Sequence, residues 1–476
     1  MRALPSMPMT IGGVVLVWAL AGCASIDPQQ SLDHANAATA AFTEGRLELA
    51  RDPDQMARRR LEAQALLAGP LGQREAVQLA LVNSPGLQAL LAQGWADAAG
   101  AAQAGRIANP VFHFERLRAG DELELGRSLS LGLLDLLSLP QRKRLADRRT
   151  EQLRWKLAAE VIDQITQVRQ AWVRAVAAQM GHRYAQQVNQ SAAASAELAR
   201  RMEAVGHFNR LSRARQQVFY ADAAAQLASS RHQMVAAREA LVRHLGLDEE
   251  QAQQLTLPER LPELPTVPLA PESVVAAANQ GRLDLRQATA DWNVAARAQG
   301  LDRIIGWTDV ELALKHNTTS DSASGTRVVQ RGVEFSVQLP LFDTGRLRRE
   351  VMDAQTLAAS LRLEAVVRSA GSQLRESYSA YRSAHDIARH YRQEVVPLRK
   401  AISDENLLRY NGMLISVFEL LADAREQVGT VLSAISAEQQ FWLAEAALQA
   451  AVVGRPVTAD IAWQNAVRPM TDAPAH

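Results

Sequence analysis

The chain has 476 residues, with 52 Lys and Arg residues against 51 Asp and Glu residues and a formal net charge of +1. This balance excludes the concentrated basic surface that nucleic-acid binding requires, so no nucleic-acid partner is expected. Aromatic residues make up only 5% of the chain, which is low for a globular enzyme core. A composition dominated by Ala, Leu, Gln, Arg and Glu favours long helices instead.

The N-terminus has the pattern of a bacterial lipoprotein signal. A thin positive region at Arg2 is followed by the short apolar stretch Ile11–Leu20 and by Leu20-Ala21-Gly22-Cys23, which matches a lipobox. We predict that residues 1–22 are a cleaved signal peptide and that Cys23, the single cysteine, carries the lipid. The alternative is a chance Cys behind an ordinary signal. The residue after Cys23 is Ala24 and not Asp. In this respect the sequence is similar to lipobox proteins that are sorted to the outer membrane.

Residues 23–70 form a polar, Ala-rich lipidated segment with helical potential. After residue 22, no apolar run reaches the ~18 residues of a membrane-spanning helix, so none is expected. Residues 71–254 form the first of two repeats. It begins with a helix over Ala76–Ala104 and continues into a hairpin from Asn109 to about Leu137.

Strict apolar/polar alternation marks the second strand of this hairpin, and period two is typical of a strand with one apolar face. Val111–Leu117 is its expected partner strand. Arg127 is the single exception on the apolar parity. The apolar parity contains Leu123, Leu125, Leu129, Leu131 and Leu133, and the polar parity contains Glu122, Glu124, Ser128, Ser130 and Gly132.

A very long amphipathic helix is expected from Pro140 to about Ala204. Its apolar residues recur every three or four positions, and about 65 residues at ~1.5 Å each reach ~95 Å, too long for a compact domain. Gly206 and Asn209 end it, and a return helix follows over about Ser212–His244. The apolar stripe contains Leu157, Val161, Ile165, Val168, Trp172 and Val176.

Residues 255–271 are rich in Pro and form an extended linker. The second repeat, residues 272–452, has the same order. A helix is expected over about Ser273–Gly300, a strand over Val310–Lys315 and a loop over Asn317–Thr326. A second alternating strand follows, with Val333, Phe335, Val337 and Leu339 opposite Glu334, Ser336 and Gln338.

A second long helix is expected from Arg346, with an interruption at Pro397. It breaks at Asn411-Gly412 and returns to about Val452. Residues 453–476 form a C-terminal tail. The fold class is therefore mainly α-helical with a β-barrel portion. Four strands cannot close a barrel alone, but several chains together can, which points to an assembled membrane pore with the apolar parity toward lipid.

The repeated order of helix, hairpin, long helix, turn and return helix resembles the TolC-like outer-membrane efflux duct family, in its lipoprotein branch. The resemblance covers roughly residues 71–452. Its most specific stretches are Gln338–Arg346 (QLPLFDTGR), Arg409–Gly412 (RYNG), Leu420–Ala424 (LLADA) and Leu257–Pro262 (LPERLP).

This resemblance implies a homotrimer with a twelve-stranded barrel in the outer membrane and a twelve-helix tunnel across the periplasm. It implies passive conduction of substrates expelled by an inner-membrane efflux pump through a periplasmic adaptor (membrane fusion) protein. Outer-membrane lipid would surround the barrel. A wide polar tunnel of this kind would pass drugs, metal ions and small metabolites alike.

The resemblance also places the two helix turns at the periplasmic tip. Adaptor docking is then expected at Gly206, Asn209, Arg210, Asn411, Gly412 and Leu414. Gate candidates are Arg409, Tyr410, Phe418, Glu419, Leu421 and Asp423. Both glycines also permit a tight turn.

The sequence departs from the family's acidic constriction, since Phe418 and Leu421 stand where well-studied members carry Asp. Leu414 stands where such members carry a locking Arg. Glu419 and Asp423 are the nearest carboxylates, and they either ring the constriction or lie on solvated helix faces.

No catalytic constellation, phosphate loop or metal-ligand pair is present in the sequence, so neither an enzyme nor a cofactor is expected. His113 falls on the polar parity of its strand, where we expect it to be solvated in a lumen. The main alternative to a duct is a structural coiled-coil lipoprotein of the cell envelope without a pore.

Overall fold

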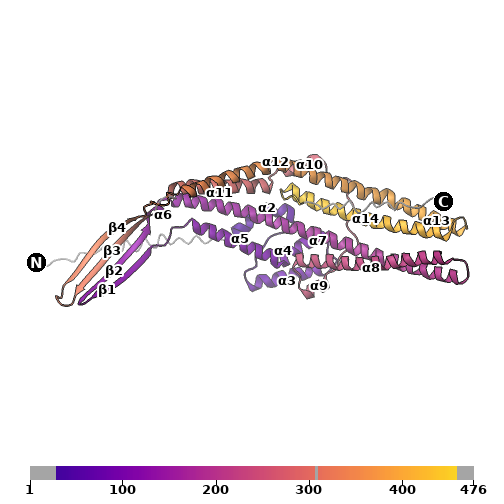
Figure 1. Cartoon of the computed structure of the whole chain (residues 1–476), viewed down its shortest axis with the longest axis horizontal. Coiled ribbons are helices and arrows are strands. Elements are labelled where there is room, and N and C mark those ends of the chain that lie inside the picture. Colours follow the sequence, from indigo (N-terminus) through magenta and orange to yellow (C-terminus); the bar gives the residue numbers. More distant parts are fainter. Residues whose placement is uncertain (1–27, 306–308, 458–476) are drawn as a thin grey trace.

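The computed structural model describes residues 28–305 and 309–457, and it is strongly elongated, with a sheet at one end and helical hairpins at the other (Figure 1). The predicted signal peptide, Cys23 and residues 458–476 of the tail lie outside this range. The first repeat and the N-terminal segment contain α2 (Pro28–Thr43), α3 (Pro53–Leu67), α4 (Gln73–Asn83), α5 (Pro85–Ala104), β1 (Val111–Ala119), β2 (Glu122–Gly132), α6 (Leu133–Leu137), α7 (Leu139–Ala204), α8 (Arg210–Leu245) and α9 (Glu249–Gln254). The second repeat contains α10 (Pro271–Ala278), α11 (Leu283–Ile305), β3 (Val310–Asp321), β4 (Arg327–Val337), α12 (Arg346–His390), the π-helical turn η1 (Tyr391–Val395), α13 (Val396–Asn411) and α14 (Val417–Val452).

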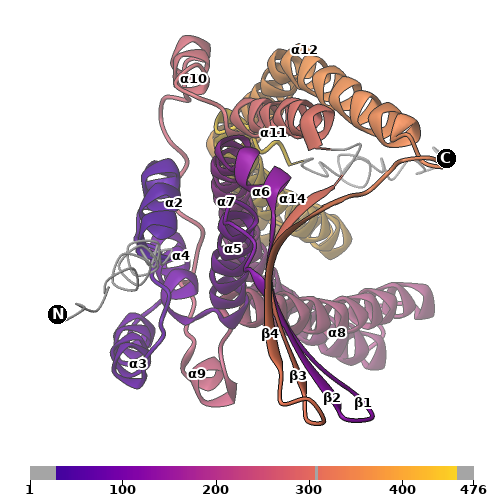
Figure 2. The same cartoon turned by 90° about the vertical axis from the view of Figure 1, so that its left-hand side faces the viewer.

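The two predicted hairpins join into one antiparallel sheet of order β1-β2-β3-β4. Its strands run side by side and bend away from the helices (Figure 2). The strands are confirmed, but two boundaries were wrong. β3 continues to Asp321, so the expected Asn317–Thr326 loop shrinks to its last few residues. Leu133 and Leu339 lie beyond β2 and β4 and are not strand residues.

The predicted long helix is confirmed as α7, which has 66 residues and a length of ~100 Å. Its middle part carries the core, where Ile162, Ile165 and Trp172 are almost fully buried. The Trp172 indole donates a hydrogen bond to the Leu71 carbonyl oxygen at 2.7 Å, which satisfies its polar atom inside the core. α8 returns along α7, and Gly246 (φ +67°) ends it in a left-handed conformation.

The second long helix runs from Arg346 to Asn411 as α12, η1 and α13, and it matches α7 in length. The interruption predicted at Pro397 is present, because the π-helical turn η1 ends just before this residue. Proline has no backbone N–H, so the helix loses one hydrogen bond there and widens locally instead of ending.

The helices that precede each hairpin are broken, which corrects the expectation of single helices over Ala76–Ala104 and Ser273–Gly300. Ser84 separates α4 from α5 and caps α5, accepting a hydrogen bond from the Leu87 amide at 3.4 Å. α10 likewise ends at Ala278, before α11 begins at Leu283. Both breaks occur at equivalent places in the two repeats, so the internal symmetry includes them.

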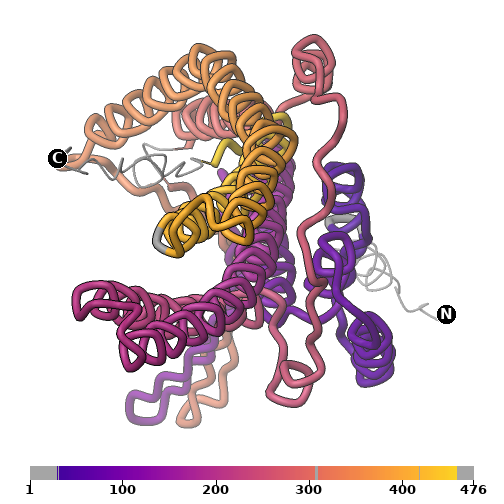
Figure 3. Tube along the Cα trace, turned by 90° about the vertical axis from the view of Figure 1, so that its right-hand side faces the viewer, coloured from indigo at the N-terminus to yellow at the C-terminus, as the bar shows by residue number. Residues whose placement is uncertain are grey.

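Viewed from the tip end, the two helical hairpins form an open arc, and α2, α3 and the Pro-rich linker lie on the other side of α7 (Figure 3). α2 packs on α5 and α7. The Arg169 guanidinium lies 4.5 Å from the centre of the Phe42 ring and donates to the Phe42 carbonyl oxygen at 2.6 Å. These contacts hold the N-terminal segment against the long helix.

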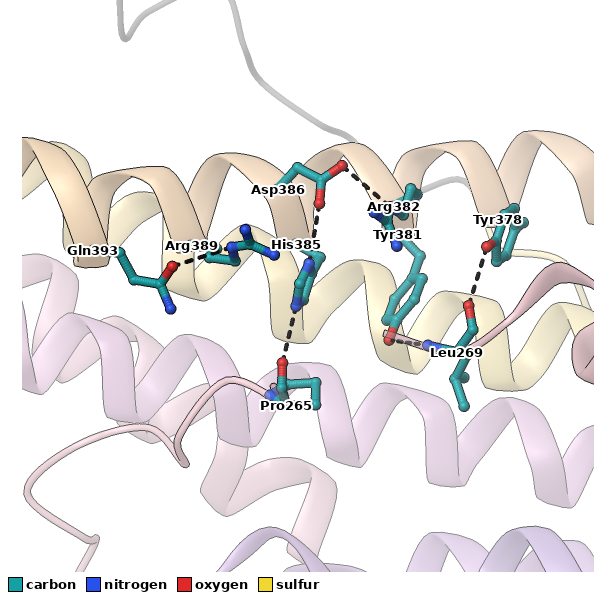
Figure 4. Close-up of polar contacts among 9 residues, drawn as sticks. All are labelled: Pro265, Leu269, Tyr378, Tyr381, Arg382, His385, Asp386, Arg389 and Gln393. Atoms are coloured by element: carbon teal, nitrogen blue, oxygen red, sulfur yellow. Dashed lines mark hydrogen bonds and ion pairs between the residues drawn. The ribbon is translucent and has the colours of Figure 1, made fainter. Parts of the chain in front are cut away.

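The Pro-rich linker crosses α12 and is fixed there by side chains of that helix (Figure 4). Tyr381 accepts a hydrogen bond from the Leu269 amide at 3.2 Å, and Tyr378 donates to the Leu269 carbonyl oxygen at 3.1 Å. His385 is fully buried and its Nε2 lies 3.0 Å from the Pro265 carbonyl oxygen. The linker is thus an ordered strap that joins the two repeats.

Asp386 supports the strap contact from the other side of the His385 ring, 3.2 Å from Nδ1, and accepts from Arg382 at 3.1 Å (Figure 4). Burial alone would raise the pKa of Asp386. The His385 hydrogen bond and the Arg382 charge outweigh that effect and hold its pKa below the ordinary value. The carboxylate therefore stays ionised beside the buried imidazole.

Candidate conduit wall and tip turns

The strand register brings the apolar parities of both predicted hairpins onto one face of the sheet. Leu129 pairs with Phe112 and Leu314, and Leu314 pairs with Val333. Residues paired across strands share a face, so these four side chains form one apolar row. Large side chains of this face are open to the surroundings in the single chain, with Phe335 59% exposed.

The opposite face is polar, and its groups interact with one another. Lys315 forms an ion pair with Glu334, and Asn317 donates a hydrogen bond to Glu124 at 3.2 Å. His113 pairs with Ser128 and therefore lies on this face, as its position in the sequence predicts. One sheet thus presents an apolar surface and a hydrated, charged surface back to back.

The first tip turn joins α7 to α8 around Gly206. Its φ of +80° is a left-handed conformation, which glycine adopts without steric cost. The Gly206 amide donates to the Glu203 carbonyl oxygen at 2.9 Å and the His207 amide to the Met202 carbonyl oxygen at 2.9 Å, the two bonds of a Schellman cap. Asn209 then caps α8, accepting from the Ser212 amide at 2.8 Å. Arg210 follows it and is exposed.

The second tip turn has the same two bonds, but its left-handed residue is Met413 (φ +59°). The Met413 amide donates to Tyr410 at 2.9 Å and the Leu414 amide to Arg409 at 2.8 Å. The predicted break at Asn411-Gly412 is confirmed, but Gly412 has an ordinary φ of −80°, so the turn does not use the conformational freedom of this glycine. The equivalent of Gly206 is therefore Met413, one residue further along.

Ser416 completes the correspondence between the two turns, since it caps α14 three residues after Met413, as Asn209 does after Gly206. Its hydroxyl accepts from the Glu419 amide at 3.3 Å, and Glu419 accepts from the Ser416 amide at 3.2 Å, a capping box. Met413 and Leu414 are 92% and 78% exposed, and Asn411 is also exposed. The tip thus presents apolar side chains to the surroundings.

The gate candidates do not lie in one cluster within the single chain. Arg409 pairs with Glu405 at 2.9 Å on its own helix, and Glu419 serves the cap of α14. Tyr410 and Leu421 are half-buried. Phe418 lies at the start of α14, and its side chain is outside the described part. The role of these residues in a constriction stays a prediction.

Asp423 is 8% exposed and lies against the neighbouring helix α13, with Oδ1 3.9 Å from the Arg399 guanidinium. Its Oδ2 has no hydrogen-bond partner in the described residues. Arg399 also contacts Glu426 at 2.5 Å. Sequence reasoning missed Arg399, because its partners lie on a different helix and no periodic pattern marks them.

A further contact missed from the sequence joins the two hairpins near the tip. The Arg425 guanidinium lies 4.5 Å from the centre of the Phe219 ring and donates to the Arg215 carbonyl oxygen at 3.1 Å. Burial lowers the pKa of Arg425, and nearby Asp222 opposes this effect. α14 is thereby held against α8, which lies about 200 residues earlier in the sequence.

Among the described residues, no group of three or more His, Cys, Asp or Glu side chains could hold a metal ion. No helix in the described ranges combines the length and the apolar character needed to span a membrane.

Comparison with solved structures identifies the fold. The chain matches the CmeC outer membrane channel of Campylobacter jejuni with a TM-score of 0.66 at 13% identity, covering 88% of this chain and 91% of that chain. It matches a membrane protein from Pseudomonas aeruginosa with a TM-score of 0.65 at 20% identity, covering 82% and 93%. It matches the open state of the MtrE outer membrane channel of Neisseria gonorrhoeae with a TM-score of 0.62 at 18% identity, covering 83% and 90%.

No protein-family model and no curated protein matches the sequence. The structural matches nevertheless extend over most of the chain and include both repeats. The chain has the fold of the TolC-like outer membrane factors, and the resemblance read from the sequence is confirmed at the level of the fold.

Proposed function

We propose that this protein is the outer-membrane exit duct of a tripartite efflux system. It conducts substrates passively across the periplasm and the outer membrane, and an inner-membrane pump supplies the energy. The proposal requires no enzyme activity and no cofactor. The observation that carries it is the two-faced sheet at the end of ~100 Å helices.

The exposed edges of the sheet support assembly from several chains. β1 and β4 each pair on one side only within the chain. In lipid every strand edge must be paired, so the sheet has to continue into neighbouring copies. Three chains give twelve strands, enough to enclose a water-filled lumen, and three open arcs of helices continue it as a tunnel (Figure 3). A homotrimer is the assembly that this geometry favours.

The orientation follows from the lipid predicted on Cys23. The anchor inserts from the periplasmic side, where the long hydrated helices also belong, so the β-hairpin turns point to the cell exterior. The tip turns then reach toward the inner membrane. Their docking residues would contact a periplasmic adaptor protein, with the exposed Leu414 and Met413 as apolar contacts and Arg210 as a charged one.

The rival function is a structural coiled-coil lipoprotein without a pore. Such a protein needs no exposed row of apolar side chains across neighbouring strands, and the row through Leu129, Leu314 and Val333 argues against it. Outer membrane channels among the structures that share this fold also favour the duct.

Membrane fractionation and planar-bilayer recording test the proposal together. We expect the mature protein in the outer-membrane fraction as a cross-linkable trimer that resists extraction by urea and carbonate. Purified trimers should give stable single-channel conductance. A lipid anchor alone also resists carbonate, so the conductance separates the two functions. A protein that leaves the bilayer insulating would support the structural lipoprotein instead.

A further inference from the structure

Charge is segregated between the two faces of the sheet. All six acidic residues within the four strands lie on the polar face, whereas all five arginines lie on the apolar face. The acidic residues are Glu115, Glu122, Glu124, Glu311, Asp321 and Glu334. The arginines are Arg116, Arg118, Arg127, Arg327 and Arg331. Lys315, the one lysine of the four strands, lies on the polar face with the acidic residues. Random placement would nevertheless not put every acidic residue on one face and every arginine on the other, so the two faces meet different surroundings.

The arginines occupy only the half of the apolar face near the hairpin turns. One row on this face, nearer the helices, contains Phe112, Leu129, Leu314 and Val333. The next row lies two residues further along each strand, away from the helices, and contains Phe114, Arg127, His316 and Arg331. The remaining three arginines lie still closer to the turns. The apolar face therefore has an aliphatic and aromatic half beside the helices and a basic half at the far end.

These arginines have no acidic partner within the described ranges, in contrast to the lysine of the opposite face. Lys315 is in contact with Glu334, but neither Arg127 nor Arg331 forms an ion pair with any residue that the structure describes. Between them lies His316, whose Nε2 is buried and has no hydrogen-bond partner in the same set of residues. This basic half thus offers several donors without an acceptor from the protein.

Arginine on the lipid face of a barrel is costly at the middle of the bilayer and tolerated near its surface. Five unpaired arginines confined to one end therefore fit the headgroup level of one leaflet. With the orientation proposed above, this is the outer leaflet, whose main lipid carries phosphate groups on a sugar headgroup. Guanidinium groups bind phosphate with paired hydrogen bonds.

We propose that the basic half of the apolar face binds the phosphate groups of lipopolysaccharide in the outer leaflet, an inference that rests on the proposed outer-membrane function. Arg127 and Arg331 are two strands apart, roughly 10 Å at the usual strand spacing. A sugar headgroup with two separate phosphates can engage both at once, which a phospholipid with a single phosphate cannot do. This match of charge and spacing selects the glycolipid.

Native mass spectrometry and thermal unfolding of the purified, full-length trimer in detergent test this binding. The probes are lipopolysaccharide, the same lipopolysaccharide after phosphatase treatment, and phosphatidylglycerol. Intact lipopolysaccharide should raise the unfolding temperature and bind more tightly than both others. Replacing both arginines in Arg127→Gln/Arg331→Gln should weaken its binding about 10- to 30-fold, given the usual contribution of each cation near a charged lipid surface.

The matched control is Lys315→Gln, which removes a cation at the same depth from the polar face and should bind lipopolysaccharide like the unmodified protein. Equal binding of the phosphatase-treated lipid, equal binding by the double variant, or an equal loss in Lys315→Gln would overturn the inference. Equally tight phosphatidylglycerol would overturn the glycolipid assignment. If the double variant does not assemble, the inference is tested by lipopolysaccharide binding to Arg331→Gln alone. The comparison of the three lipids on the unmodified trimer tests it as well.

Failure of the proposed function has a different signature. If the protein forms no trimer in the outer-membrane fraction, the duct itself is wrong, and the lipid inference falls with it. A conducting outer-membrane trimer whose lipid binding and unfolding temperature do not depend on lipid phosphate would overturn this inference alone.

Discussion

Met413 holds a left-handed backbone conformation (φ +59°) just after the end of α13. Helices that end with a left-handed residue usually have glycine there. A side chain in this conformation costs about 1 kcal/mol. The first hairpin avoids this strain, because Gly206 occupies the equivalent position with φ +80°. The strained methionine is also among the most exposed apolar residues of the chain, at a tip that we propose to dock an adaptor.

Substitutions at the two turns therefore have opposite expected effects. Met413→Gly should stabilise the second tip by about 1 kcal/mol, and Gly206→Ala should destabilise the first tip by about the same amount. Hydrogen exchange of the tip amides measures both. Gly412→Ala is the control, since its φ is ordinary and an added Cβ would come no closer than 3.5 Å to the Leu408 oxygen. A cost for Gly412→Ala equal to that for Gly206→Ala would contradict the assignment of the turn.

Glu445 is a largely buried carboxylate on α14 that connects to the N-terminal segment. It accepts from Gln449, which accepts from Arg169, the residue that contacts Phe42 on α2. Burial raises the pKa of Glu445 above its ordinary value of 4.5, although Arg169 and Gln449 oppose the shift.

The sign of the pH dependence follows from this raised pKa. A carboxyl group whose pKa is higher in the folded state binds its proton more tightly there, so its stabilising contribution is complete below pH 4.5. That contribution is lost as the pH rises through the folded pKa. The melting temperature of Glu445→Gln should therefore fall less between about pH 4 and pH 8 than the melting temperature of the unmodified protein. The control is Glu376→Gln, because Glu376 is exposed on α12 and has no ion-pair partner among the described residues. Identical pH profiles for all three proteins would refute the assignment.

At the scale of elements, the strands and the long helices follow from local patterns. Period two over Leu123–Leu131 and the three- and four-residue spacing from Leu157 to Val176 were each sufficient to predict their element. The packing of the elements was not predictable in the same way. The Arg425–Phe219 contact and the linker bonds to Tyr381 and His385 join segments more than 100 residues apart, and no local spacing marks them.

The break between α4 and α5 had a visible signal in Ser84-Pro85, a capping residue followed by a helix-starting proline. The resemblance indicated the turn of the second hairpin, but its left-handed position falls on Met413 and not on the glycine beside it. Glycine at position 412 is the natural choice from sequence, and the cap geometry instead selects Met413. The gate residues remain predictions, because a constriction depends on how neighbouring copies meet.

Glu419 and Asp423 near the second tip provide the test of an acidic gate. Threefold symmetry would triple their charge within a narrow opening, which attracts cations and repels anions. Glu419→Gln/Asp423→Asn should then reduce the cation preference of single channels in a planar bilayer and weaken block by multivalent cations. Because Asp423 lies against Arg399, the exposed Glu419 is expected to contribute most.

The control for the gate is Glu394→Gln, which removes one carboxylate charge per chain at a distance from the tip and is compared with Glu419→Gln alone. Unchanged selectivity in the double variant would mean that both carboxylates lie outside the opening. The constriction would then be apolar, formed by Phe418 and Leu421, and would close by excluding water.

The whole molecule combines two repeats, each with a β-hairpin at one end and a helical hairpin at the other (Figure 1). The strap of residues 255–271 and the helices α2 and α3 lie on the opposite side of α7 from the open arc (Figure 3). In the proposed trimer, the open side of this arc would enclose a tunnel with two further copies. This arrangement makes the membrane-facing role of the sheet the central claim about the assembled protein.

Paired arginine substitutions on adjacent residues of β4 test this claim most directly. Phe335 pairs with Leu312 on the apolar face, and Ser336 pairs with Glu311 on the polar face. Phe335→Arg places a charge in lipid, at a cost of ~2–4 kcal/mol per chain near the bilayer midplane, whereas Ser336→Arg adds a solvated charge beside a carboxylate. The yield of trimer in the outer-membrane fraction is the measurement. The account predicts a severe loss for Phe335→Arg and a nearly normal yield for Ser336→Arg, and equal yields from the two variants would contradict it.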